Sequence, residues 1–259
     1  IRRQRQMCIR DSTTTDKKQN FNYEIQRNED GTVIGIKSNI NGAFSPELTQ
    51  NVSNFDLVCA LGAVNNQSTI LNGEMAASRN LQLTQEIRDK SGLQANVYEK
   101  GDEIILAVNG FHSAKDIQQG AYITKNNRPE LKYSGIELAA NDTQLIKLEQ
   151  IYFTYKKLAE AQGKKLIIAG YSMGGAMTRL VAIKHSEDTA TRFVSFNALG
   201  TGNIQGRNIE SYVIKGDNKS NPESGIASRV YKADGTPSSF ESTISNKHSI
   251  EAFLYCPKK

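Results

Sequence analysis

A short apolar run at residues 165–169 leads into the turn Gly170-Tyr171-Ser172-Met173-Gly174, and a helical segment follows at once. A strand that enters a G-x-S-x-G turn and a helix that leaves it force the backbone through a sharp, strained bend. The bend holds the serine hydroxyl at the carboxyl edge of a sheet, and the helix N-terminus directs backbone N–H groups at the same place. This order of elements predicts a strand–turn–helix unit that presents Ser172.

The chain after about residue 95 alternates between short apolar strands and helices. The sequence predicts strands at Glu103–Val108, Lys165–Ala169, Phe193–Phe196, Tyr212–Ile214 and Arg229–Lys232, and helices at Thr143–Ala161 and Gly174–His185. Short apolar strands separated by helices indicate a mostly parallel sheet that is covered on both faces. We therefore expect the fold class α/β.

The N-terminal third carries no chemical motif. Residues 23–40 read as a hairpin around the turn Glu29-Asp30-Gly31, and helices are predicted at Asn54–Asn65 and Glu74–Lys90, the second closed by Gly92. We expect one domain over residues 23–259, in which residues 23–94 precede a catalytic core at 95–259. Residues 13–22 are polar and are expected to be disordered or a linker.

We interpret residues 1–12 as a sequencing-adapter artefact, because Met7–Ser12 back-translates to ATG-TGT-ATA-AGA-GAC-AG and the chain lacks an initiator Met. A natural basic tail is the alternative. Excluding four arginines and one aspartate lowers the net charge from +5 to +2, so the pI of 9.0 no longer indicates a nucleic-acid partner. Cys59 and Cys256 then remain, either as a pair or as buried thiols.

A serine hydroxyl needs a base, and the chain has three histidines. His185 ends the helix that begins at Ser172, which places it about 20 Å from the hydroxyl at about 1.5 Å per residue. His112 precedes the serine, whereas the base follows the nucleophile in this kind of fold. His248 lies near the chain end, before a short apolar helix, and is therefore the predicted base.

The predicted acid is Asp217, which follows the apolar run at residues 212–214. Catalytic groups of such sheets collect beyond the carboxyl ends of the strands. Asp234, in Ala233-Asp234-Gly235, is the alternative, although Asp-Gly is more often only a turn. Asp188 directly follows the helix of the nucleophile, so we expect it on the wrong side of the sheet.

With these residues placed, the chain resembles the class 3 lipases, the fungal-lipase-like branch of the α/β-hydrolases. Three segments carry the resemblance: Leu106–Phe111 with Asp116 beyond it, Ile168–Ala176 and Val194–Gly200. It covers about residues 95–255. The resemblance implies the α/β-hydrolase fold and hydrolysis of acyl esters of lipids, in which Ser172 attacks, His248 transfers the proton and Asp217 orients the imidazole. It implies no metal and no organic cofactor.

The chain departs from this family at two positions. Tyr171 stands where His usually precedes the serine, and Asn109-Gly110-Phe111 stands where Arg-Gly-Thr or Arg-Gly-Ser forms the oxyanion turn. The hydroxyl donor expected near residue 111 is therefore absent. We expect the backbone N–H groups of Phe111 and Met173 to form the oxyanion hole, because main-chain donors are what the mechanism needs.

Other functions remain open at this point. An acyltransferase or a thioesterase would use the same residues, and a catalytically silent hydrolase-fold binding module would keep the fold alone. Gly120–Asn141 is either a solvated loop or a lid over an acyl pocket. No run approaches the about 18 apolar residues of a membrane-spanning helix, so membrane contact is expected to be peripheral. Because we expect the true N-terminus to be missing, localisation stays open.

Overall fold

The fold is described from a computed structural model, which describes residues 23–27, 29, 33–38, 42–66, 68, 70–110, 143–199, 209–217 and 239–256. The predicted strand Arg229–Lys232, the segment Gly120–Asn141 and residues 1–22 lie outside this part of the chain. Within it, the predicted N-terminal hairpin is confirmed. It consists of β1 (Tyr23–Arg27) and β2 (Val33–Ser38), which pair antiparallel as a separate two-stranded sheet.

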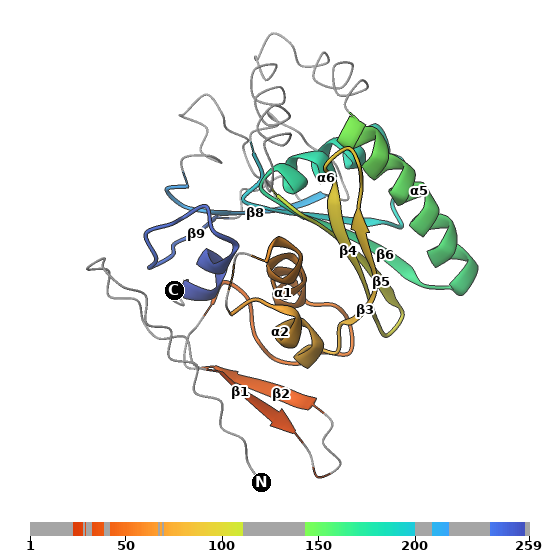
Figure 1. Ribbon diagram of the computed structural model, residues 1–259. Coiled ribbons are helices and arrows are strands. Elements are labelled where there is room, and N and C mark those ends of the chain that lie inside the picture. Colours follow the sequence, from red (N-terminus) through yellow and green to blue (C-terminus); the bar gives the residue numbers. More distant parts are fainter. Residues whose placement is uncertain are drawn as a thin grey trace.

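A seven-stranded sheet in the order β3-β4-β5-β6-β7-β8-β9 forms the centre of the described structure (Figure 1). Its strands are β3 (Gln82–Arg88), β4 (Gln94–Lys100), β5 (Glu103–Val108), β6 (Lys165–Tyr171), β7 (Arg192–Phe196), β8 (Ile209–Ile214) and β9 (Ser239–Phe240). The three strands at one edge, β3 to β5, pair antiparallel. All pairs from β5 to β9 are parallel, which confirms the expected mostly parallel sheet.

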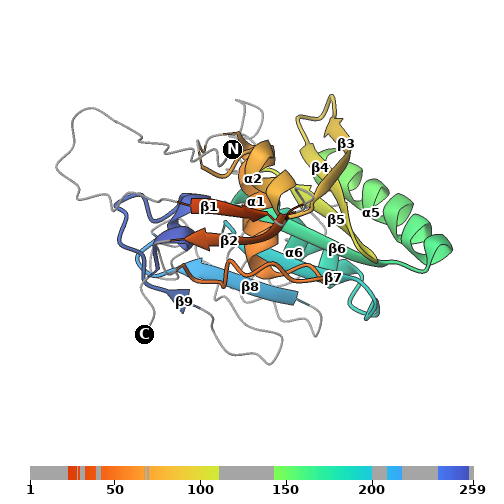
Figure 2. The same ribbon diagram turned by 90° about the horizontal axis from the view of Figure 1, so that it is seen from below.

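Helices cover both faces of this sheet, and the side chains of the central strands alternate between them. Ile105 of β5 and Ile167 of β6 belong to the buried cluster that includes α1 (Asn54–Asn65). Their neighbours Ile104 and Ile168 belong to the cluster beneath α5 (Thr143–Gln162) and α6 (Met173–Lys184). Figures 1 and 2 show α1 and α5 on opposite faces. Strands buried on both faces are what the continuous apolar runs in the sequence predict.

Helix α1 spans the predicted residues because its ends carry strong local signals. Ser53 accepts a hydrogen bond from the Asp56 N–H, and the Asp56 carboxylate accepts one from the Ser53 N–H at 2.8 Å, so the two residues form a capping box. Asn66 ends the helix in the left-handed conformation with a φ of 49°.

The helix predicted at Glu74–Lys90 is wrong. The structure has a short helix α2 (Gly73–Ser78) followed by strand β3, and Gly92, with a φ of 99°, lies in the turn between β3 and β4. Most β3 side chains are exposed, so the strand has no buried face that would give the sequence a period of two. Its backbone pairing with β4 decides its conformation.

A buried group of charges joins the N-terminal third to the main sheet. The Asp56 carboxylate accepts hydrogen bonds from Arg79 Nε at 2.6 Å and from Lys100 Nζ on β4 at 2.8 Å. Asp56 and Arg79 are fully buried. Arg79 also donates to the backbone carbonyls of Pro46 and Glu47, so the irregular segment before α1 is bound to the same group.

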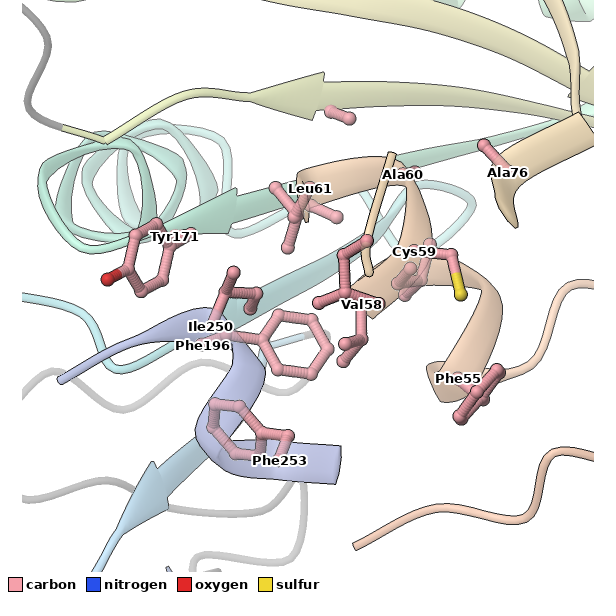
Figure 3. Close-up of a cluster of buried hydrophobic side chains, with 14 of the residues drawn as sticks. Phe55, Val58, Cys59, Ala60, Leu61, Ala76, Tyr171, Phe196, Ile250 and Phe253 are labelled. Carbon is pink, nitrogen blue, oxygen red and sulfur yellow. The ribbon is translucent and has the colours of Figure 1, made fainter. Parts of the chain in front are cut away.

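The C-terminal helix η3 (Ile250–Tyr255) closes the cluster that α1 covers. Figure 3 shows Phe253 of η3 and Phe196 of β7 within this cluster, with Tyr171 at its margin. Cys59 and Cys256 are both buried here as free thiols. Burial raises the pKa of Cys256 to about 12, so this thiol stays protonated near neutral pH. Among the described helices, none is long and apolar enough to cross a membrane.

Candidate active site

The backbone at Ser172 has the strained geometry that the glycine-rich turn predicts. Strand β6 ends at Tyr171, helix α6 begins at Met173, and Ser172 between them has φ 55° and ψ −118°. This combination is sparsely populated for a residue with a Cβ, and such strain is concentrated at functional sites. The bend sends the chain from the sheet into the helix and leaves the serine hydroxyl at the carboxyl edge of the sheet.

The two glycines that flank Ser172 are required by close backbone contacts. A Cβ at Gly170 would lie 2.3 Å from the Gly174 carbonyl oxygen, and a Cβ at Gly174 would lie 2.3 Å from the carbonyl oxygen of Asn109. Each contact is with backbone, which cannot move aside as a flexible side chain can. The turn therefore packs tightly against the end of β5, and only glycine fits at both positions.

His248 lies beside the serine hydroxyl. The Ser172 Oγ and the His248 Nε2 are 2.8 Å apart, within hydrogen-bond distance. Ser172 is 3% exposed and the His248 side chain is 12% exposed, so the pair is largely shielded from water but still reachable. His248 precedes Ser249, which caps η3 by accepting a hydrogen bond from the Glu251 N–H.

Asp217 lies on the other side of the imidazole. Its Oδ2 is 2.7 Å from the His248 Nδ1, and the residue is 1% exposed. Asp217 comes three residues after the end of β8, at the carboxyl edge of the sheet, as predicted for an acid of this kind. Asp234, the alternative acid, lies outside the described residues.

The structure separates the remaining candidates from Ser172. His185 ends α6, at the opposite end from the serine, and its Nε2 lies 2.7 Å from a Glu149 carboxylate oxygen. Asp188 accepts hydrogen bonds from the Tyr152 hydroxyl and from the backbone of Thr191. Burial alone would raise the pKa of Asp188, but the hydrogen bonds from Thr191, Tyr152 and Lys156 outweigh it and lower the pKa. Both residues therefore have partners of their own at that end of α6. His112 lies outside the described residues.

Of the two predicted oxyanion donors, one can be placed. Met173 is the first residue of α6, where backbone N–H groups and the positive end of the helix dipole point out of the helix. Phe111 lies outside the described residues. Its predecessor Gly110 lies against the nucleophile, since a Cβ at Gly110 would be 3.0 Å from the Ser172 Cβ. The turn after β5 thus begins beside Ser172.

Two side chains at the site were not assigned a role from the sequence. The Tyr171 hydroxyl donates a hydrogen bond of 2.5 Å to the backbone carbonyl of His248, and the two rings lie 5.5 Å apart. Burial raises the pKa of Tyr171, and the nearby Asp217 raises it further, so the phenol keeps the proton that it donates. Asn197, fully buried at the end of β7, also donates to the His248 carbonyl. A polar residue at the end of an apolar strand was the available signal for Asn197.

Two hydrogen bonds connect the Ser172 hydroxyl, the His248 imidazole and the Asp217 carboxylate in series. In such a series the imidazole accepts the hydroxyl proton while the carboxylate holds the imidazole in the required tautomer and stabilises its charge. Within the described residues, no group of three or more His, Cys, Asp or Glu side chains is arranged to hold a metal ion. The arrangement suits nucleophilic attack by Ser172.

Comparison with solved structures finds fungal lipases. A nonglycosylated lipase of Yarrowia lipolytica is 17% identical over 64% of this chain and 71% of that chain, with a TM-score of 0.45. The Rhizomucor miehei lipase in complex with its propeptide is 14% identical over 80% and 77%, with a TM-score of 0.41. An Aspergillus oryzae mono- and diacylglycerol lipase is 13% identical over 66% and 73%, with a TM-score of 0.42. No family model and no curated protein matches the chain.

The architecture of the chain itself places it in a fold class. A sheet that is parallel from β5 to β9 carries helices on both faces, and the strand β6 passes through a strained serine turn into α6. These features define the α/β-hydrolase architecture. The chain has the α/β-hydrolase fold and is similar to the fungal lipases, the family that its sequence motifs resemble.

Proposed function

We propose that the protein is a serine hydrolase that cleaves carboxylic esters of lipids through an acyl-enzyme on Ser172. The observation that carries this proposal is the series of two hydrogen bonds from the Ser172 Oγ to the His248 Nε2 and from the His248 Nδ1 to Asp217. It occurs at the strained turn that exposes a nucleophile in this fold. If these three side chains met only by chance, Ser172 would not need its strained backbone conformation.

In the proposed reaction, His248 removes the proton from the Ser172 hydroxyl while the oxygen attacks the ester carbonyl carbon. The carbonyl oxygen becomes an oxyanion, which the backbone N–H groups of Met173 and Phe111 stabilise. Collapse of this intermediate breaks the bond to the alcohol, which takes the proton from His248 as it leaves. Water then repeats the sequence on the acyl-enzyme, releases the carboxylic acid and returns the proton to Ser172. Asp217 stabilises the imidazolium in both steps.

The change at the oxyanion turn does not remove this chemistry. Asn109-Gly110-Phe111 lacks the hydroxyl that the resembling family has near residue 111, but the proposed donors are backbone groups. The Asn109 side chain accepts a hydrogen bond from the Gly110 N–H at 2.8 Å and donates one to Gln94 at 3.1 Å. These contacts hold the start of the turn in place. A hole made of two main-chain donors is therefore expected to function without the hydroxyl.

The substrate class follows from the resemblance of the sequence to class 3 lipases, which implies acyl esters of lipids. Such substrates collect in emulsions, micelles and membranes, so we propose peripheral contact with a lipid surface. No nucleic acid is expected as a partner. The proposed reaction uses no metal and no organic cofactor.

The nucleophile is tested with a fluorophosphonate probe, which labels activated serines covalently. Wild-type protein is expected to be labelled, whereas Ser172→Ala and His248→Ala are not. His185→Ala is the matched control for the base, because His185 lies at the far end of α6. Asp217→Asn is expected to slow labelling by about 10⁴-fold, while Asp234→Asn leaves it unchanged. A folded wild-type protein that is not labelled would refute the enzyme proposal in favour of a silent binding module.

The substrate is tested with three classes of acyl donor. Hydrolysis of p-nitrophenyl butyrate, of emulsified diacylglycerol and of phosphatidylcholine vesicles is compared with hydrolysis of an acyl-coenzyme A thioester. Release of free fatty acid from the lipid esters supports the proposal. Faster turnover of the thioester, or transfer of the acyl group to an added alcohol in place of water, would identify a thioesterase or an acyltransferase instead.

A further inference from the structure

The segment at residues 196–199 begins at the last residue of β7, and its two ends contact the backbone of the nucleophile. The Ser172 N–H donates to the Phe196 carbonyl at 3.0 Å, and the Leu199 N–H donates to the Ser172 carbonyl at 3.0 Å. Asn197 lies between these two contacts. These two hydrogen bonds therefore fix the backbone at position 197 close to that of Ser172.

The Asn197 side chain reaches the two other loops of the site. Its Oδ1 accepts a hydrogen bond of 2.9 Å from the Ile214 N–H, at the end of the strand that precedes Asp217. Its Nδ2 donates to the backbone carbonyls of Lys247 at 3.0 Å and of His248 at 3.3 Å. One buried amide thus joins the segment behind the nucleophile to the strand of the acid and to the loop of the base.

These contacts require an amide, and the backbone conformation alone does not. Asn197 has a φ of 43°, in the left-handed region, where glycine is unstrained and asparagine is tolerated. An aspartate has nearly the same shape, but its carboxylate can only accept hydrogen bonds and would face the two carbonyls. The position needs one acceptor and two donors in a single planar group, which asparagine provides.

A second donor acts on the same carbonyl. The Tyr171 hydroxyl also donates to the His248 carbonyl, so this oxygen accepts hydrogen bonds from the ends of two neighbouring strands, β6 and β7. Lys247 and His248 lie in a turn and Ser249 lies in a bend, outside the described strands. Among the described residues, the side chains of Tyr171 and Asn197 thus link the backbone of this loop directly to the sheet.

We propose that Asn197 is a positioning residue that keeps His248 and Asp217 in line with Ser172. It touches neither the substrate nor the reacting atoms, and it acts through the backbone of the loop that carries the base. The inference rests on the proposed function of Ser172. A displacement of about 1 Å at a catalytic group costs about 10²-fold in rate, so loss of these hydrogen bonds has a measurable effect.

The test compares Asn197→Gly and Asn197→Asp with wild type in the full chain. Glycine keeps the backbone conformation and removes the amide, whereas aspartate keeps the shape and the acceptor for Ile214 but loses both donors. We expect kcat on p-nitrophenyl butyrate to fall about 10- to 100-fold in both variants, with KM changed less than about 3-fold. Ser195→Ala is the matched control.

This control removes a buried hydrogen bond of the same two strands. The Ser195 and Ser211 hydroxyls lie 2.8 Å apart and join β7 to β8, with no part in the His248 loop. It is expected to lower the midpoint of thermal unfolding but to leave kcat within about 2-fold of wild type. A drop in kcat that follows thermal stability equally in all three variants would assign Asn197 a structural role only.

A spectroscopic measurement separates this inference from the proposed function. Proton NMR of histidine-labelled protein detects the Nδ1 proton of His248 at low field when it is bonded to Asp217, whether or not the protein hydrolyses any ester. We expect this resonance in wild type and Ser195→Ala, and its loss or an upfield shift in both Asn197 variants. Loss of the resonance in His248→Ala assigns it to His248. Wild-type kcat in Asn197→Gly, or an unchanged resonance in Asn197→Asp, would overturn the inference; an inactive wild type that shows the resonance would overturn the proposed function alone.

Discussion

Replacing Asp56 by alanine is expected to destabilise the protein by about 3–5 kcal/mol, because it leaves two buried cations without their carboxylate. Asp56 and Arg79 are fully buried, and the Lys100 side chain is 4% exposed, so water cannot replace the lost partner. The substitution also removes the acceptor for the Ser53 N–H, which is half of the capping box of α1. The N-terminal third has no chemical motif, yet this group binds it to β4.

The loss is measured by thermal and urea unfolding followed by circular dichroism. A protein of this size loses about 2–4 °C in Tm per kcal/mol, so Asp56→Ala is expected to lower Tm by about 6–20 °C. Asp56→Asn keeps the acceptor for the Ser53 N–H and so isolates the effect of the charge. Asp102→Ala is the control: its contact with Lys165 is 3.8 Å long and exposed, and its loss changes stability by less than about 1 kcal/mol. Equally small losses of stability in Asp56→Ala and in Asp102→Ala would refute the reasoning.

Three further predictions concern the site and its support. Tyr171→Phe removes one donor to the His248 carbonyl and is expected to lower kcat about 2- to 10-fold with no change in KM; a wild-type kcat would mean that this hydrogen bond is not used. Gly174→Ala forces a Cβ against the backbone at Val108 and is expected to destabilise the protein by at least about 1–3 kcal/mol in urea unfolding, whereas Gly73→Ala, with open space around it, is neutral. The pKa of Asp188 is lowered in the folded state, so its contribution to stability is present above its unfolded pKa and is lost as the pH falls through the lowered value. The stability difference between wild type and Asp188→Asn should therefore shrink between pH 7 and strongly acidic pH, and a difference independent of pH would contradict this.

Elements with strong local signals were predictable from the sequence. The helix Asn54–Asn65 has the bounds that were predicted, and the capping box of Ser53 and Asp56 is the physical reason for its start. The strands β5 and β6 were evident as apolar runs because both of their faces are buried. Strand β3 was not, because its side chains are exposed and its conformation is set by backbone pairing with the next strand, β4.

In the candidate site, too, the features with local sequence signals were predictable and the contacts between distant segments were not. The glycine-rich turn, the order of serine, acid and histidine, and the position of Asp217 after a strand were all legible in the sequence, and their catalytic roles stay predictions until the labelling experiment is done. The choice of His248 among three histidines used only its place along the chain. The structure adds the distances, 2.8 Å and 2.7 Å, that connect these three side chains.

The sequence by itself determined the strand–turn–helix around Ser172 and the parallel sheet, because backbone strain, glycine requirements and the periodicity of burial act over a few neighbouring residues. Only the tertiary structure decided what holds the site together. Asn197 and the His248 carbonyl are 51 residues apart, and the Tyr171 hydroxyl reaches the same carbonyl from a distance of 77 residues along the chain. Such hydrogen bonds depend on how separate loops pack together at one edge of the sheet, and a local pattern of residues does not predict that packing.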